Sequence, residues 1–127
     1  MPETLAQPVQ TEKDFLPLNG TDHVEFYVGN ARQAAHFYRT AFGFEWQAYR
    51  GPETGVRDRA SYLLVQNKIR LVLTTPLHPD HPIAEHVRMH GDGVHDIALW
   101  VDDAEASWTA TVDRGARSVR PPETLRD

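Results

Sequence analysis

Residues 22–43 read DHVEFYVGNARQAAHFYRTAFG, the strongest strand-then-helix pattern of the sequence. Its first seven residues alternate apolar side chains with polar or aromatic ones, and a period of two predicts a half-buried strand. Asn30 follows as a good helix N-cap. Across residues 31–42 the apolar side chains recur with helical spacing, which predicts an amphipathic helix. Gly43 stands where a left-handed C-terminal cap is expected.

Three further strands are expected after this helix. They cover residues 44–50, 57–66 and 69–75, where alternating or continuous apolar side chains are bounded by turn residues. Residues 20–75 are therefore expected to form a first β-α-β-β-β unit.

The same pattern begins again later in the chain. A strand is expected at residues 94–101, an Asp-Asp pair caps a helix at 104–114, Gly115 follows it, and a strand starts at 116–119. These elements lie about 72 residues after their counterparts, which indicates an internal repeat. The two strands that would complete the second copy are absent. The expected fold class is therefore α+β, with duplicated β-α-β-β-β units of which the second is truncated.

Two further segments complete the organisation. Residues 1–19 hold prolines, mixed charges and little periodicity, and a flexible leader is expected there. Residues 76–93 form a connector between the repeats, bounded by prolines and glycines. Within it, residues 83–90 predict a short helix with Pro82 at its first position. The incomplete second β-α-β unit then occupies residues 94–127.

Composition limits the function classes. The 127 residues include 13 Lys and Arg against 18 Asp and Glu, and the net charge of −5 argues against a nucleic-acid surface. The longest apolar run spans only residues 97–101, whereas a membrane-spanning helix needs about 20. No cysteine is present, which excludes disulfides, thiol catalysis and cysteine-ligated metal sites. With no signal peptide visible, a cytoplasmic protein without a membrane partner is expected.

Two residues on one strand face are the candidate metal ligands. His23 shares its face of the first strand with Glu25 and Tyr27. Asp96 holds the matching place in the repeated strand, whereas His95 is expected on the other face because side chains alternate. A third ligand would come from a strand that the chain lacks, and a catalytic metal needs about three protein ligands. A position that only hydrogen-bonds is therefore favoured over a working metal site.

A second histidine group lies on the connector. His86 and His90 are four residues apart on the expected helix and so share one face. With His78 or His81 nearby they offer adventitious zinc or nickel binding. The favoured alternative is that they only surround a surface helix, because no carboxylate spacing completes the set.

Other polar residues support weaker hypotheses. Arg50, Arg57 and Arg59 form a possible keto-acid clamp, but these side chains beside a turn are expected to face solvent. Glu53 and Asp92 lie in turns next to glycines, where acidic residues usually bond local backbone groups. No catalytic residue and no cofactor-binding residue is assigned in this chain.

Three motif blocks resemble one enzyme family. Residues 23–38 (HVEFYVGNARQAAHFY), 48–55 (AYRGPETG) and 85–98 (EHVRMHGDGVHDIA) are similar, in this order, to the N-terminal domain of the 4-hydroxyphenylpyruvate dioxygenases. That family belongs to the vicinal oxygen chelate, or glyoxalase–bleomycin resistance, superfamily. The resemblance runs from about Phe15 to the last residue, and it implies paired repeat units around a ligand cavity.

The resemblance also implies an activity. The family converts 4-hydroxyphenylpyruvate and O2 to homogentisate and CO2 in tyrosine catabolism. It uses a non-haem Fe(II) held by two histidines and a glutamate of the C-terminal catalytic domain. This implies a structural role for the N-terminal portion, which alone is expected to be inactive and to hold no cofactor. The implied partners are the C-terminal catalytic domain and further copies in a homo-oligomer.

Two alternatives remain open. Hydroxymandelate synthase acts on the same keto acid and shares this half. The second alternative is that the chain is a stand-alone ligand-binding or glyoxalase-like protein that completes its cavity as a dimer. An open sheet edge is expected in every case. It leaves the faces of Ile97, Leu99 and Trp108 partly uncovered, which predicts marginal stability or association.

Overall fold

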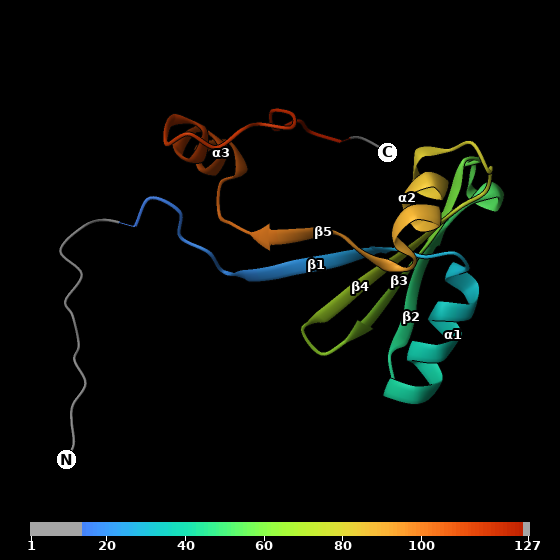
Figure 1. Ribbon diagram of the computed structural model, residues 1–127. Coiled ribbons are helices and arrows are strands. Elements are labelled where there is room, and N and C mark those ends of the chain that lie inside the picture. The colour runs from blue at the N-terminus through green and yellow to red at the C-terminus, as the bar shows by residue number, and fades with distance from the viewer. Residues whose placement is uncertain (1–13, 126–127) are drawn as a thin grey trace, which may run out of the picture. The chain divides into compact units, whose positions relative to one another are not determined.

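The computed structural model describes residues 14–125 (Figure 1). Most of the leader expected at residues 1–19 therefore lies outside the described residues. The strands and helices, in chain order, are β1 Gly20–Tyr27, α1 Ala31–Phe42, β2 Glu45–Arg50, the short 3-10 helix η1 Pro52–Thr54, β3 Arg59–Gln66, β4 Ile69–Pro76, α2 Pro82–His90, β5 Gly93–Trp100 and α3 Ala104–Asp113. Each element expected between residues 20 and 114 is present, with ends within two residues of the expected ones.

The described chain divides into two bodies. The sheet body is Gly20–Trp100, and the terminal body comprises the described residues of Met1–Asn19 and Val101–Asp127. The sheet body holds one mixed sheet with the strand order β2-β3-β4-β1-β5. Neighbouring strands pair antiparallel except β1 and β4, which are parallel. The first four strands and α1 form the expected β-α-β-β-β unit, and the fold class is α+β.

The hydrophobic core lies between α1 and one face of the sheet. Small residues on the helix allow this close packing, since Ala31 and Ala35 are both buried against the strands. Val24 and Phe26 of β1 pack against the same core, so the alternation in β1 places their polar neighbours on the other face. The buried core residues are Val28, Ala31, Ala35, Phe44, Tyr62, Leu64, Leu71 and Leu73.

Local signals set the helix ends. The Asn30 side chain accepts a 3.0 Å hydrogen bond from the Gln33 N–H, and Gly43 takes the left-handed conformation with φ 79°, as expected for caps. Pro82 begins α2 as expected. His81 caps that helix, because its Nδ1 accepts a 3.1 Å hydrogen bond from the Ile83 N–H.

The strand expected at residues 116–119 is not formed, so the second repeat is described only as β5 and α3. The reason lies in pairing. The corresponding strand of the first repeat is β2, which pairs only with β3. No described strand follows α3, so residues 116–119 have no equivalent partner. The expected β-α-β unit is therefore corrected to β-α.

Side-chain contacts organise the terminal body by itself. The indole Nε1–H of Trp108 donates a 2.8 Å hydrogen bond to Ser118 Oγ. The Arg114 guanidinium lies 3.8 Å from the centre of the Phe15 ring, a cation–π contact.

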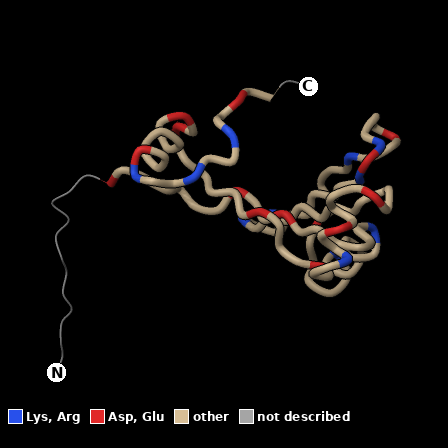
Figure 2. The backbone as a smooth tube through the Cα atoms, turned by 45° about the horizontal axis from the view of Figure 1, so that its top comes forward, with Lys and Arg blue, Asp and Glu red and all other residues tan. Residues whose placement is uncertain are grey.

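Figure 2 shows Lys and Arg scattered among Asp and Glu along the tube. No helix within residues 14–125 has the length and apolar composition that crossing a membrane requires.

Candidate functional site

The sheet face opposite the core is here called the polar face. Alternation places His23, Glu25 and Tyr27 of β1 on it, and the neighbouring strands supply hydroxyls and an arginine at the same depth. Its other members are Arg59, Ser61 and Leu63 of β3 and Val72 and Thr74 of β4. A polar cluster on one sheet face, inside an apolar fold, is the candidate functional site of the described chain.

A directional chain of hydrogen bonds crosses three strands of the polar face. The Thr74 hydroxyl donates to Glu25 Oε2 at 2.8 Å. Its oxygen lies 2.8 Å from Ser61 Oγ, and since the single Thr74 proton is committed to Glu25, Ser61 is the donor of that bond. Thr74 is fully buried, so its hydroxyl is satisfied inside the protein. The chain holds the Glu25 carboxylate in a defined position.

A cavity of about 440 Å³ lies beside the hydrogen bonds of the polar face. Its polar lining includes Glu25, Ser61, Arg50 and Arg59, while Leu63 and other apolar side chains complete it. The lining therefore offers a carboxylate, a hydroxyl and two guanidinium groups to a ligand of mixed polarity. Arg50 and Arg59 line the cavity, and Arg57 does not. Arg50 and Arg57 are exposed, as expected for these arginines, whereas Arg59 is half-buried.

Arg59 is held by a neighbouring carboxylate. Its Nε and Nη2 donate to Asp58 Oδ2 at 3.1 and 3.0 Å, and His81 Nε2 lies 2.9 Å from the same oxygen. The hydrogen bonds from Arg59, and secondarily from His81, lower the pKa of Asp58 below its ordinary value. Because His81 Nδ1 accepts the α2 capping bond, the proton of the neutral ring lies on Nε2 and points to Asp58.

An acid–phenol pair stands at the rim of the cavity. The Tyr49 hydroxyl donates to Glu53 Oε2 at 2.6 Å. This hydrogen bond raises the pKa of Tyr49 to about 12 and lowers the pKa of Glu53. Glu53 therefore bonds the Tyr49 side chain, and a hydrogen bond from its own backbone also lowers its pKa. Asp92, the other turn acid, accepts a 2.9 Å hydrogen bond from the Gly29 N–H, a distant rather than local backbone partner.

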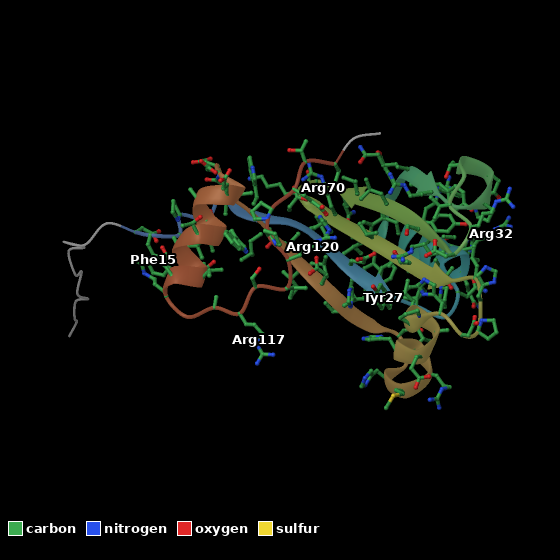
Figure 3. All side chains as sticks on the ribbon, turned by 90° about the horizontal axis from the view of Figure 1, so that it is seen from above. Phe15, Tyr27, Arg32, Arg70, Arg117 and Arg120 are labelled. Carbon is green, nitrogen blue, oxygen red and sulfur yellow. The ribbon has the colours of Figure 1, made fainter. Side chains whose placement is uncertain are left out.

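An imidazole cluster surrounds Tyr27, which lies close to α2 (Figure 3). The His95 ring is stacked on Tyr27, with centroids 3.9 Å apart, and the His86 ring meets Tyr27 edge-on at 5.2 Å. His90 lies beside His86, with ring centroids 5.0 Å apart. Burial, and then the charge of Glu25, raise the pKa of Tyr27.

The position of His95 corrects a prediction. Asp96 pairs with Glu25 and Val94 pairs with Phe26, so an irregularity in β5 leaves His95 between the two pairs. A bulge of this kind breaks strict alternation and re-aims a side chain. His95 therefore stacks on Tyr27, a residue of the polar face, instead of pointing away from it.

The structure does not bring the two candidate metal ligands together as a pair. His23 lies opposite Ala98 in the register, and Asp96 lies opposite Glu25. The His23 Nδ1 is instead 2.8 Å from Asp22 Oδ2, a hydrogen bond between neighbours. His23 therefore has a hydrogen-bond partner in the structure, and its role as a hydrogen-bonding position rather than a metal ligand stays a prediction.

The residues do not fit a centre of two histidines and one carboxylate. Within residues 14–125, no group of three or more His, Asp or Glu side chains is placed to hold a metal ion. His86 and His90 share a helix face as expected, but within the described chain no carboxylate joins them. Among the described residues, iron at this site would lack the ligand set that such a centre requires.

Sequence reasoning missed two of the three members of the hydrogen-bond chain, Ser61 and Thr74. Ser61 and Thr74 interrupt otherwise apolar strands, and each falls in phase with the polar side of its strand. This position on the polar side of each strand could have identified both residues from the sequence. The pairing of Ser61 with Thr74, and of β1 with β4, depends on register, which the pattern of a single strand does not specify.

The chain is similar to known proteins along most of its length. The family model for the Glyoxalase/Bleomycin resistance protein/Dioxygenase superfamily matches residues 22–126. The chain belongs to this superfamily. It is 45% identical to the 4-hydroxyphenylpyruvate dioxygenase of Dictyostelium discoideum over 87% of the chain and 30% of that protein. It is 40% identical to that of Pyricularia oryzae over 89% of the chain and 31% of that protein.

A solved structure shows the same likeness. A variant of 4-hydroxymandelate synthase from Streptomyces coelicolor superposes with a TM-score of 0.79 at 36% identity, covering 84% of this chain and 32% of that one. The chain therefore spans about a third of the length of the relatives that it matches. The resemblance to this superfamily and to its dioxygenases is confirmed, and so is the fold.

Proposed function

We propose that this chain is the N-terminal portion of a 4-hydroxyphenylpyruvate dioxygenase-like enzyme. Such an enzyme converts 4-hydroxyphenylpyruvate and O2 to homogentisate and CO2 in tyrosine catabolism, using Fe(II) held elsewhere. The observation that supports this most directly is the 40–46% identity to such dioxygenases across most of the chain but only about a third of their length. A cytoplasmic location belongs to the same proposal.

In this proposal the role of the chain is structural. Its polar face lacks a metal-holding group within the described residues, so the iron and the chemistry belong to a C-terminal catalytic domain. The sheet body presents β5 as the outer strand of its sheet. Large apolar side chains are exposed along that strand, and they favour burial against further chain. These side chains are Val94, Ile97, Leu99 and Trp100.

A chimera tests the structural role. The matched segment of the Dictyostelium dioxygenase is replaced by residues 20–125 of this chain, and homogentisate formation is measured with Fe(II). We expect activity above that of the Dictyostelium enzyme lacking the segment. A second chimera carrying L73D disrupts the buried core at Leu73, which is 1% exposed, and is expected to lose that gain. A folded, iron-loaded chimera without homogentisate formation contradicts the proposal.

Hydroxymandelate synthase is the second candidate, supported by the TM-score of 0.79. It predicts that a matching chimera with the synthase retains a larger share of the parent activity than the dioxygenase chimera does. The reverse ratio favours the dioxygenase.

A stand-alone, dimeric ligand-binding protein is the third candidate. The 440 Å³ cavity and the exposed apolar side chains of β5 support it. Light scattering on the purified chain, with bound metal measured on the same sample, separates these candidates. A stable dimer with one metal per chain favours the stand-alone protein, and a metal-free, concentration-dependent oligomer favours the N-terminal portion.

A further inference from the structure

A second cavity lies between α1 and β2, on the core side of the sheet and away from the polar face. Its volume is about 160 Å³, and it is less open than the cavity of the polar face. Four of its lining residues come from α1, and the other two come from β2 and β3. They are Arg32, Ala35, His36, Arg39, Trp46 and Leu64.

The inner part of this cavity is apolar and aromatic. Leu64 is fully buried and Ala35 is 4% exposed, so together they form the floor. The Trp46 side chain forms one wall and remains 48% exposed. Its ring packs against the buried Tyr62 ring at a centroid distance of 4.9 Å, which holds the indole in place. An apolar cavity of about 150 Å³ is large enough for one benzene ring.

The rim of the cavity is cationic. Arg32, His36 and Arg39 recur at i, i+4 and i+7 along α1, so they share one helix face. Arg32 extends at the surface of the sheet body (Figure 3). No acidic residue among those that the structure describes lines this cavity. Glu45, the acidic residue directly before Trp46 in the sequence, lines a neighbouring groove together with Arg39.

Neither arginine pairs with an acidic residue of the described chain. Among residues 14–125, every ion pair of the structure involves other cations: His23, Arg59, Arg70, His81, Arg88 and Arg120. Guanidinium groups at an apolar cleft with no carboxylate offer unused donors to an anion.

We propose that this cavity binds a small aromatic carboxylate. The ring lies over Leu64 and against the Trp46 indole, where aromatic contact and burial of apolar surface stabilise it. The carboxylate reaches the rim, where Arg32 and Arg39 donate charge-assisted hydrogen bonds. The volume admits one ring with a short acidic side chain, and the apolar floor disfavours a fully hydrated anion such as phosphate.

The experiment uses the full 127-residue chain and phenylacetate as the probe. The ¹H–¹⁵N cross-peak of the Trp46 indole, assigned by its loss in W46F, is followed at constant ionic strength. We expect a saturable shift at millimolar phenylacetate. Benzyl alcohol keeps the ring without the charge, and acetate and inorganic phosphate keep a charge without the ring. Each of these three is expected to bind at least about fivefold more weakly, because each loses one of the two contributions.

Matched arginine variants locate the carboxylate. R32Q and R39Q are each expected to weaken phenylacetate binding about fivefold. R57Q removes an exposed arginine that lines neither cavity and is expected to change nothing. The proposal is overturned by the absence of a saturable Trp46 shift, by equal affinity for any of the three comparison probes, or by equal affinity of R32Q, R39Q and R57Q. The readout requires no enzyme activity, so it does not depend on the proposed function.

Discussion

The Thr74 hydroxyl donates a 2.8 Å hydrogen bond to the Glu25 carboxylate, and this contact joins β4 to β1 on the polar face. The two residues are far apart in sequence, and the parallel pairing of their strands brings them together. Since Thr74 is fully buried, the bond places a carboxylate at the cavity without leaving a buried polar group unpaired.

Replacing Thr74 by valine tests this hydrogen bond. T74V keeps the shape but removes the donor to Glu25 and the acceptor for Ser61, so the free energy of unfolding is expected to fall by about 1–3 kcal/mol. S61A removes only the outer member of the chain and is expected to cost less. Urea denaturation of both variants measures the difference. A loss in S61A equal to that in T74V would show that the Glu25 bond contributes nothing.

Truncation of Leu64 tests the core between α1 and the sheet. Leu64 is fully buried, and L64A is expected to lower the free energy of unfolding by about 2–5 kcal/mol because it leaves a cavity. I69A changes a side chain that is 53% exposed and is expected to cost far less. Similar losses in both variants would contradict the placement of the core.

The pKa of Asp58 tests the contact with Arg59. The hydrogen bonds of Arg59 lower this pKa in the folded chain, so the stabilisation is present above the ordinary carboxyl pKa and is lost as the pH falls through the lowered value. R59Q is expected to return the Asp58 pKa toward 3.8, measured by ¹³C NMR titration. R57Q changes an exposed neighbouring arginine and is the control. A shift of the same size in R57Q would show that the lowered Asp58 pKa comes from nearby positive charge in general and not from the Arg59 hydrogen bonds.

Tyr49 and Glu53 provide a test at high pH. The hydrogen bond raises the pKa of Tyr49 to about 12, so its stabilising contribution is present below the ordinary value of 10.0 and is lost as the pH rises toward 12. E53A removes the acceptor, and Tyr49 is expected to ionise nearer pH 10, as seen in the ultraviolet absorbance of tyrosinate. The difference spectrum of Y49F identifies this residue. An unchanged titration in E53A would rule out the hydrogen bond as the cause.

The edge strand β5 predicts association. Ile97 and Leu99 are 60% and 50% exposed on a strand that, among the described strands, pairs only with β1, so the melting temperature is expected to rise with protein concentration. L99K places a charge on this edge and is expected to reduce the oligomer seen by light scattering. A chain that stays monomeric, with the same melting temperature at every concentration, would contradict this prediction.

Much of the local structure could be predicted because short-range physics determines it. The alternation in β1, the Asn30 cap and the left-handed Gly43 are encoded within a few residues, and the structure contains all three. The strand expected at residues 116–119 failed for a different reason. A strand needs a partner, and the pattern of one segment does not say whether that partner is present.

The order of the elements from β1 to α3 and the membership of the superfamily could be read from local patterns and motif blocks. Which side chains meet depends on tertiary packing. The bulge that turns His95 onto Tyr27, the contact of Thr74 with Glu25, and the cationic rim beside Trp46 all depend on register and on helix placement. Those are set by the simultaneous packing of distant segments, because a shift of one residue moves every side chain of a strand to the opposite face.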